Sequence, residues 1–424
     1  MRCLLFILMC MGMQSIAQPT LQPGAPATAG MNAARLNRID ALVQQYIDSQ
    51  WIAGGTAIIA RNGVIVYHKA FGVSNMDTKT PEKVDDIFRI ASQTKAITSV
   101  AVMILFEEGK LLLDDPIGKY IPAFEGQQVI DTFNEKDTTY TMVKAKRAVT
   151  IRDLLTHTSG IGYAQIGTVR AKAMYAKAGV HSQIGNPSES LQEQVLKIAA
   201  LPLEYQPGER FSYGLNSDVL GYLVEVISHQ SLADFFRTRI FEPLGMKDTW
   251  FYLPKEKQSR LVALHTEDSR KKIIVMKKAP GNMSNLVIDY PNAAGRMYSG
   301  GAGLSSTALD YAIFLQMMLN GGIYNGKRIL SKNSVDMMTQ NQIGNVDRGP
   351  YEKFGLGFGI VTENGTARIG QSEGTFSWGG AFSSNYFADP KEKLVVQFFL
   401  NQTPNSHWDI LDKFKVLVYS AIEK

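Results

Sequence analysis

The segment that most constrains the fold runs from Ser92 to Gly109 and reads SQTKAITSVAVMILFEEG. Beyond Lys95 its residues are apolar on nearly every side of a helix. A helix without a polar face is stable only where other elements cover it. Gly109 is the kind of residue that commonly follows the end of a helix. We therefore predict a buried central helix around which the other elements pack.

Strand patterns lie near both ends of the chain. Residues 54–61 and 64–72 are rich in β-branched residues and flank Asn62-Gly63, a pair typical of a tight hairpin turn. Four later segments are predicted to be successive antiparallel strands, namely residues 354–363, 366–371, 378–390 and 393–402. Amphipathic segments at 32–50 and 406–424 predict flanking helices. We expect the two ends, about 32–109 and 291–424, to form one antiparallel sheet covered by helices.

The middle of the chain, about 110–290, has a different character because helix starts dominate it. Thr150 and Ser190 are each followed three residues later by an acidic residue, as in a capping box. Another helix is predicted from Asn216 or Ser217, and long loops span 120–149 and 251–290. The sequence therefore predicts an α+β fold with an inserted, mostly helical subdomain and a cleft between the two parts.

The N-terminus has the features of a secretory signal peptide over residues 1–17. Arg2 is followed by an apolar stretch and then by Ser15-Ile16-Ala17, a small-x-small cleavage site. Residues 18–31 are rich in Pro, Ala and Gly and are expected to be a flexible leader. Lipid attachment at Cys10 is disfavoured because Met9 precedes it. We expect a secreted or periplasmic protein without an integral membrane span.

Composition excludes several classes of function. The 424 residues carry 44 basic and 39 acidic side chains, a formal charge of +5 without long runs of one sign, so nucleic acid is not an expected partner. Both cysteines, Cys3 and Cys10, lie in the segment that cleavage would remove. The mature chain would have no thiol for catalysis, disulfides or metal binding. The six histidines show no metal-ligand spacing, so neither a metal nor another cofactor is expected.

One G-x-S-x-G pattern, from Gly370 to Gly374, places Ser372 where an α/β-hydrolase carries its nucleophile. The order Ser372, Asp389, His407 also fits that class. However, no helical pattern follows Ser372, and only about fifty residues remain for the rest of such a fold. We therefore interpret this G-x-S-x-G as accidental.

A better nucleophile candidate is Ser92, in Ser92-Gln93-Thr94-Lys95. Residues three apart on a helix share one face, so the side chains of Ser92 and Lys95 can meet. The first helical turn offers free N–H groups and the positive end of the dipole to a developing anion. Burial disfavours the charged ammonium of Lys95, and the neutral amine can accept the serine proton. The spacing alone is short and also fits a capping serine followed by a surface lysine.

The chain resembles the serine β-lactamase and penicillin-binding-protein superfamily, in its class C β-lactamase, D-Ala-D-Ala carboxypeptidase and esterase branch. The resemblance covers about residues 35 to 420. It rests on six blocks in the family's order: IASQTKAITSVAVMILFEEGKLLLDDPIGKYIP, TIRDLLTHTSGI, PGERFSYGLNSDVLGYLVEVIS, PLGMKDT, SGGAGLSSTALDYAIFL and WGGAFSSNYFADP. It implies a β-lactamase/transpeptidase-like fold.

The resemblance implies roles for three residues. Ser92 matches the acylated serine, Lys95 its base or proton relay, and Tyr213 the tyrosine of the family's Y-x-N element, which passes the proton to the leaving group. Here the sequence departs from the pattern, because Leu215 stands at the asparagine position and Asn216 comes one residue later. The amide contact that the family makes to a substrate is therefore in doubt.

The third element of the family is also altered. In place of K-T-G or H-x-G the chain has Thr375-Phe376-Ser377-Trp378-Gly379-Gly380, and a W-G-G at this place resembles the carboxylesterases built on the class C fold. We expect a backbone N–H between Trp378 and Gly380 to form the oxyanion hole with that of Ser92. Ser377 is a further candidate. The missing basic residue weakens recognition of a substrate carboxylate and favours neutral esters.

These residues predict an exported serine hydrolase that forms an acyl-enzyme with a small-molecule ester or amide. Within the class, carboxylesterase ranks ahead of β-lactamase and of D-Ala-D-Ala carboxypeptidase or D-aminopeptidase. A hypothesis of another class is a receptor that binds β-lactams or peptidoglycan fragments without turnover. His157 matches a family block with a mainly structural role. The natural substrate, the acyl-chain length and the oligomeric state do not follow from the sequence.

Overall fold

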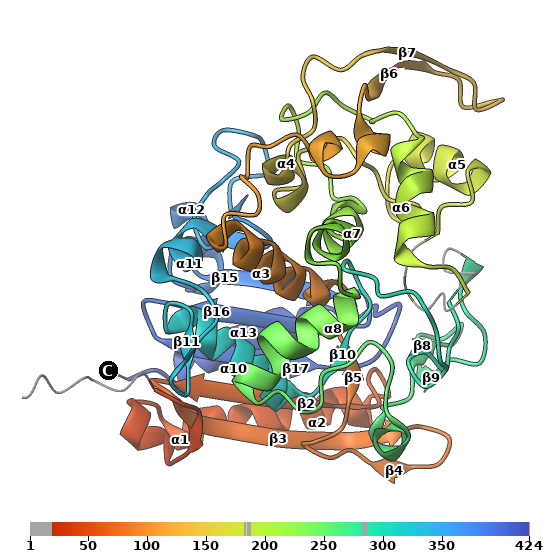
Figure 1. Ribbon diagram of the computed structural model, residues 1–424. Helices are drawn as coiled ribbons and strands as arrows, with labels where there is room; N and C mark the ends of the chain where they lie inside the picture. Colours follow the sequence, from red (N-terminus) through yellow and green to blue (C-terminus); the bar gives the residue numbers. More distant parts are fainter. Residues whose placement is uncertain (1–18, 182–183, 185–187, 282–285, 424) are drawn as a thin grey trace, which may run out of the picture.

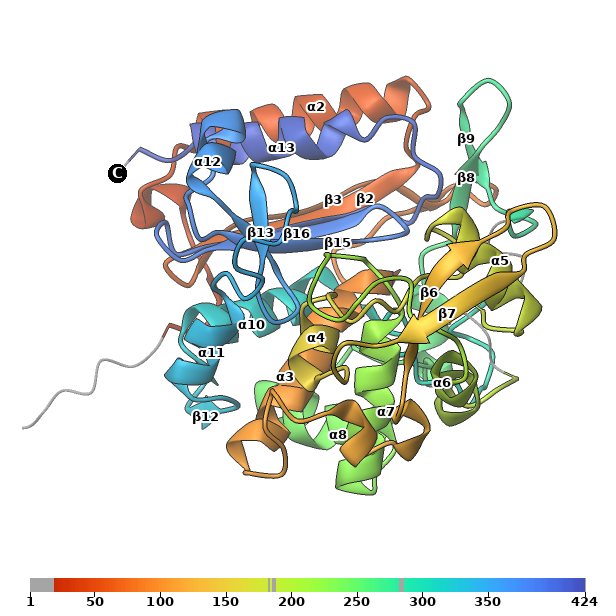
Figure 2. The same ribbon diagram turned by 90° about the horizontal axis from the view of Figure 1, so that it is seen from above.

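The computed structural model describes residues 19–181, 184, 188–281 and 286–423. A twisted sheet forms the centre of the molecule, and helices cover both of its faces (Figures 1 and 2). Helices α2 (Arg38–Asp48) and α13 (Asp409–Ser420) lie together on one face. The opposite face carries α3 (Thr94–Glu107) and α10 (Ala308–Leu319), beyond which lies the helical middle of the chain. The α+β fold class is confirmed.

Nine strands form the main sheet in the part of the chain that the structure describes. Their order is β1-β3-β2-β17-β16-β15-β14-β13, with β4 paired to β3 outside this path. The pairs are antiparallel except for β1 with β3. The bounds are β1 Gln22–Pro23, β2 Gly54–Arg61, β3 Val64–Asn75, β4 Thr80–Pro81, β13 Glu352–Phe354, β14 Gly359–Val361, β15 Phe376–Gly380, β16 Ser384–Asp389 and β17 Leu394–Phe399. The sheet is thus built from both ends of the chain.

The N-terminal hairpin shows how the sequence pattern sets the sheet. Asn62 and Gly63 have φ angles of 54° and 80°, as a type I′ turn requires. Along β2, Ile58 and Ala60 enter the core under α3 and α10, whereas Ala57 and Ile59 enter the core under α2 and α13. Alternate side chains of a strand point to opposite faces, and both faces here are buried. This explains why the strand is apolar at nearly every position.

The predicted central helix is confirmed and is preceded by one 3₁₀ turn. Ala91–Gln93 form this turn, and α3 continues from Thr94 to Glu107 with every residue up to Leu105 buried. Gly109 follows with a φ of 68°. The nearby short strands β5 (Phe88–Arg89) and β10 (Ser305–Ser306) pair with one another and lie beside the start of this helix.

The middle of the chain contains helices, as expected, but also two hairpins inside the predicted loops. Strands β6 (Gln128–Phe133) and β7 (Tyr140–Lys144) form the hairpin that projects at the top of Figure 1, and β8 (His265–Glu267) pairs with β9 (Ile273–Val275). The helices are α4 Ile151–Leu155, α5 Val169–Lys177, α6 Leu191–Ala199, α7 Asn216–Ser228, α8 Leu232–Phe236 and α9 Glu242–Leu244, with a π-helical turn over Arg237–Phe241. Both predicted capping boxes, at Thr150 and Ser190, are present.

The remaining short elements complete the two ends of the chain. They are α1 Ala33–Leu36, α11 Lys332–Met338, α12 Glu363–Ile369, β11 Ile323–Tyr324 and β12 Lys327–Arg328. Five 3₁₀ turns are described, at Pro26–Ala29, Ala91–Gln93, Ile117–Lys119, Pro122–Phe124 and Lys255–Arg260. The division of the chain into a sheet-forming part and a helical insertion at residues 110 and 290 stays a prediction.

Two local predictions are wrong. Residues 366–371 were predicted as a strand, but most of them belong to α12, because Thr362 caps a helix by accepting a hydrogen bond from the Gly365 N–H. Residues 19–31 are not a free leader: β1 pairs with β3, and Leu21 and Met31 are buried. Leu21 belongs to one hydrophobic core cluster, and Ala29 and Met31 belong to another. The predicted signal peptide, residues 1–17, lies outside the described residues.

Candidate active site

Ser92 lies in the 3₁₀ turn that leads into α3. It is 9% exposed, so most of the residue is covered by its neighbours. The preceding Ala91 has a φ of 43°, which a residue with a Cβ rarely adopts. Such strained positions persist only where the surroundings hold them, and they cluster at functional sites. The first N–H groups of the helix have no partner within the helix, so this turn can stabilise negative charge.

Lys95 lies one helical turn beyond Ser92 and points back to it. Its Nζ is 3.3 Å from Ser92 Oγ and donates a second hydrogen bond, at 2.7 Å, to the backbone O of Gly301. The lysine is 2% exposed, and its Nζ lies 4.8 Å from the centre of the Tyr213 ring. The face shared by Ser92 and Lys95 is therefore the one that the sequence spacing predicts.

Tyr213 approaches the same serine from the loop before α7. Its hydroxyl donates to Ser92 Oγ at 2.8 Å. Its ring packs between Tyr163 and Trp378, with centroid distances of 5.6 and 5.5 Å. The three residues predicted to act together thus meet at one oxygen atom, although 121 positions separate Tyr213 from Ser92. Such an arrangement suits proton transfer to and from a serine nucleophile.

Strand β15 passes directly beside the turn that carries Ser92. A Cβ added to Gly380 would lie 2.3 Å from the backbone O of Ile90, so only glycine permits this approach. Strand β14 pairs with β15 only as far as Ser377, which leaves an open edge from Trp378 to Gly380. Backbone directions alternate along the strand: Thr375 O faces β14, and Gly380 O accepts from Ser383 in the turn to β16. By that alternation, the N–H of Gly379 points to the open edge.

The two remaining predicted site residues are Asn216 and Ser377. Asn216 is fully buried, with its amide oxygen accepting from Ser159 and its Nδ2 2.8 Å from His157 Nδ1. Asn216 therefore belongs to the buried layer that includes His157, and a contact of its amide with a substrate stays a prediction. Ser377 is half-buried within β15, opposite Gly359 and Phe387.

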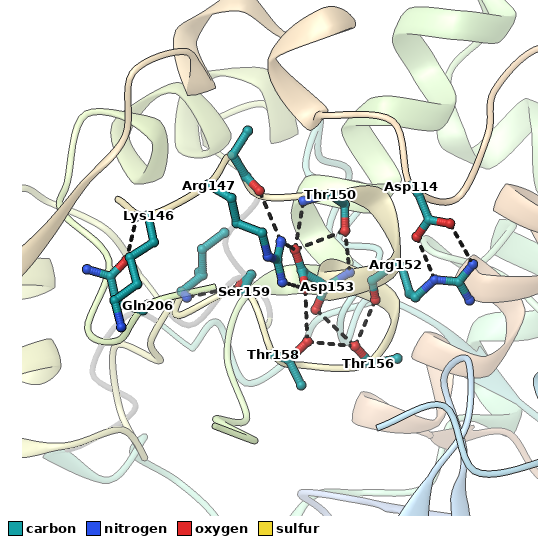
Figure 3. A network of polar contacts seen from close by, with 12 residues as sticks. Asp114, Lys146, Arg147, Thr150, Arg152, Asp153, Thr156, Thr158, Ser159 and Gln206 are labelled. Atoms are coloured by element: carbon teal, nitrogen blue, oxygen red, sulfur yellow. Dashed lines mark hydrogen bonds and ion pairs between the residues drawn. The ribbon is translucent and has the colours of Figure 1, made fainter. Parts of the chain in front are cut away.

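His157 belongs to this supporting layer. Burial, and then the positive charges of Lys95 and Arg348, lower its pKa well below 6.5, so the ring is neutral. It lies 4.8 Å from the Tyr213 ring and has a φ of 55°. A polar network at α4 holds this turn: Asp153 accepts from Thr150, from Arg147 and from Thr158, the residue that follows His157 (Figure 3).

Arg348 is a neighbour of the site that the sequence analysis missed. It precedes β13, and its guanidinium lies 4.4, 5.1 and 5.2 Å from the rings of Phe211, Phe354 and Trp378. Its Nη2 donates to Glu352 at 2.9 Å, and its Nε is buried without a hydrogen-bond partner in the described structure. Burial lowers the pKa of Arg348. The Arg348 guanidinium therefore lies against Trp378, although β15 itself contains no basic residue. No sequence motif indicated this role for Arg348.

Ser372 lies in a different environment from Ser92. It is buried, and its backbone N–H donates to Asp389, whose carboxylate also accepts from the Tyr419 hydroxyl. Strand β15 and not a helix follows it. Within the described residues, no cluster of three or more His, Cys, Asp or Glu side chains is placed to hold a metal ion, and no helix is both long and apolar enough to cross a membrane.

Comparisons with known proteins agree with this geometry. The family model described as "Beta-lactamase" matches residues 39–419. Esterase EstB of Burkholderia gladioli is 30% identical over 89% of this chain and 93% of its own length. A putative D-alanyl-D-alanine carboxypeptidase of Escherichia coli K12 is 29% identical over 85% of this chain and 79% of its own length. The structure of EstCE1, a hydrolase with promiscuous acyltransferase activity, superposes with a TM-score of 0.77 at 25% identity, over 91% and 99% of the two chains. The chain therefore belongs to the beta-lactamase family.

Proposed function

We propose that this protein is an exported serine hydrolase that works through an acyl-enzyme, and that it is a carboxylesterase. The observation that carries the proposal is the pair of contacts at Ser92 Oγ, which Tyr213 OH approaches to 2.8 Å and Lys95 Nζ to 3.3 Å. Two groups able to move a proton are thus in reach of one nucleophile.

In the proposed reaction, Lys95 as the neutral amine accepts the Ser92 proton with the help of Tyr213, and Oγ forms a bond to the ester carbonyl carbon. Negative charge then develops on the carbonyl oxygen. Backbone N–H groups of Ser92 and of the open edge of β15, where Gly379 points outward, stabilise it. Tyr213 gives a proton to the leaving alkoxide as the carbon–oxygen bond breaks. Water then attacks the acyl-enzyme by the reverse proton path and releases the acid.

Two features support an ester substrate. Trp378 stands where related peptidases carry a basic residue, so β15 presents an aromatic surface beside Tyr213. Two of the relatives named above are an esterase and a hydrolase with acyltransferase activity. β-Lactamase or D-Ala-D-Ala carboxypeptidase activity is the second candidate. Arg348 favours it, because a guanidinium next to Trp378 attracts a carboxylate.

The test compares the protein with Ser92→Ala on p-nitrophenyl butyrate and on nitrocefin, with intact-mass analysis of the trapped enzyme. We expect turnover of the ester, a smaller or absent rate on nitrocefin, and loss of both with Ser92→Ala. Turnover of nitrocefin above the ester would favour the second candidate. A stable adduct at Ser92 without turnover would instead support the receptor hypothesis. Unchanged hydrolysis by Ser92→Ala would overturn the mechanism.

Export is the part of the proposal that rests on residues 1–17 alone. If the segment is a signal peptide, the protein recovered from outside the cytoplasm begins at Gln18, after Ala17. N-terminal sequencing of that protein tests this. Recovery of the full-length chain in the cytoplasm would contradict it.

A further inference from the structure

A buried carboxylate lies beneath the site, and the mechanism above gives it no role. Asp218 stands in the first turn of α7, five residues after Tyr213, and is 2% exposed. Its Oδ1 accepts a hydrogen bond from the Ser299 hydroxyl at 2.6 Å and another from the Gly301 N–H at 3.2 Å. A charged group removed from water in this way needs compensation by hydrogen bonds or by an opposite charge.

Gly301 connects this carboxylate to Lys95. Its N–H donates to Asp218, and its C=O accepts from Lys95 Nζ at 2.7 Å. A Cβ at this residue would lie 2.4 Å from Asp218 Oδ2, so the segment can pass so close only as glycine. The preceding Gly300 is fixed from the other side, because its C=O accepts from Thr98 of α3 at 2.6 Å. One peptide segment thus links the carboxylate on α7 to the amine on α3.

Several titratable groups surround Lys95. From the loop after α4, Lys95 faces Tyr163, whose ring centre is 5.9 Å away, and the neutral His157. From the loop before α7 it faces Tyr213, and from α7 itself Asp218. Arg348, behind Trp378, is the other cation that acts on this cluster. Among these described groups, Asp218 is the carboxylate. Burial raises its pKa, whereas the positive charge of Lys95 acts in the opposite direction.

We propose that Asp218 is a positioning residue: it holds the Gly301 carbonyl against Lys95, and its charge acts through that lysine on the proton transfer from Ser92. Asp218 does not touch the substrate and acts only through Gly301 and Lys95. This inference rests on the proposed function, because it assigns a regulator to the same proton acceptor.

The decisive variant is Asp218→Asn, in which the amide oxygen keeps the place of Oδ1 as acceptor while the charge is lost. Without a carboxylate beside it, the amine loses its proton more easily. We therefore expect the acidic limb of the kcat/KM profile to move to lower pH by at least about one unit, the lower end of the effect of a nearby opposite charge. The plateau rate should change less than the position of the limb.

A matched control is Asp310→Asn. Asp310 is also a buried carboxylate near the start of a helix, but it accepts from the Asp248 N–H and the Thr249 hydroxyl and not from the Gly301 segment that contacts Lys95. The acidic limb of this control should coincide with that of the unmodified protein. If Asp218→Asn does not fold, Ser299→Ala serves instead: it removes one donor to the carboxylate, which then protonates more readily, and should shift the limb in the same direction by a smaller amount.

Two outcomes overturn the inference. In the first, Asp218→Asn folds, the acidic limb of its kcat/KM profile coincides with that of the control, and its rate falls equally at every pH. That result is expected of a purely structural residue. The other is a limb that moves to higher pH in either variant. Failure of the proposed function looks different, because Ser92→Ala would then remain active. If Ser92→Ala is inactive and the acidic limb of Asp218→Asn does not move, only the role of Asp218 is refuted.

Discussion

Replacing Tyr213 with Phe separates proton transfer from packing at this site. The substitution removes only the hydroxyl that donates to Ser92 Oγ at 2.8 Å. The ring keeps its contacts with Tyr163, Trp378 and His157, at 5.6, 5.5 and 4.8 Å, and its position 4.8 Å from Lys95 Nζ. The shape of the site should therefore survive while one of the two proton-moving groups is lost.

The size of the effect follows from what this hydroxyl does. A positioned general acid or base contributes about 10²–10⁴-fold to a rate, or about 2.7–5.5 kcal/mol of transition-state stabilisation. The same hydrogen bond contributes only about 1 kcal/mol to the folded state. We therefore expect kcat/KM to fall by at least about 100-fold. The midpoint of thermal unfolding should shift by a few degrees at most.

The assay uses two butyrate esters that differ in their leaving group. An alkoxide needs a proton as it departs, whereas p-nitrophenolate leaves without one, so Tyr213→Phe should lose more activity on ethyl butyrate than on p-nitrophenyl butyrate. Circular dichroism melting checks the fold. A correctly folded variant that keeps its activity on ethyl butyrate within threefold of the unmodified protein would refute the role of Tyr213. Equal losses on both esters would exclude proton delivery to the leaving group.

Three further substitutions test other parts of the structure. Ser372→Ala should keep kcat/KM within about twofold of the unmodified protein. Peptide mapping after reaction with a fluorophosphonate should find no label on Ser372, and a label there would support the α/β-hydrolase interpretation. Arg348→Met removes three cation–π contacts of about 0.5–1 kcal/mol each, so the free energy of unfolding in urea should fall by about 1.5–3 kcal/mol. The preference for a succinate monoester over a butyrate ester should fall as well, and an unchanged ratio would mean that the guanidinium only packs. Burial, and then the Asp86 carboxylate, raise the pKa of Glu82 well above 4.5, so the contribution of Glu82 to stability is present below pH 4.5 and is lost as the pH rises. In urea unfolding, Glu82→Gln should therefore stabilise the protein more at pH 8 than at pH 5. An equal gain at both pH values would show that Glu82 is ionised when buried.

Local signals predicted much of the fold because they act within a few residues. The Asn62-Gly63 turn, the helix from Ser92 and the capping boxes at Thr150 and Ser190 each depend on neighbouring positions. The resemblance added the order of the blocks, and with it the meeting of Ser92, Lys95 and Tyr213. Family blocks carry this long-range information even though no local pattern does.

Other features depend on contacts that the sequence does not display. Residues 366–371 have the composition of a strand, yet the cap at Thr362 turns them into a helix. Arg348 reaches Trp378 only because β13 and β14 bring its loop back across the site. Asp218 resembles an ordinary first-turn acid of α7, and its proximity to Lys95 depends on where residues 299–301 pass between two helices. Such roles follow from tertiary structure alone.

The contact between β15 and the turn at Ser92 has a consequence for the order in which the chain becomes competent. Gly380 of β15 lies against the Ile90 carbonyl, and the Ser384 hydroxyl at the start of β16 donates to the same carbonyl across 294 positions. Strands β15–β17 continue the sheet from the hairpin of β2 and β3. When residues 1–370 have been synthesised, Ser92, Lys95 and Tyr213 have been made, but β15, the strand with the open edge, has not. Pairings between distant segments form late. The nascent chain is therefore expected to remain inactive on esters until residues 376–399, which form β15 to β17, have emerged.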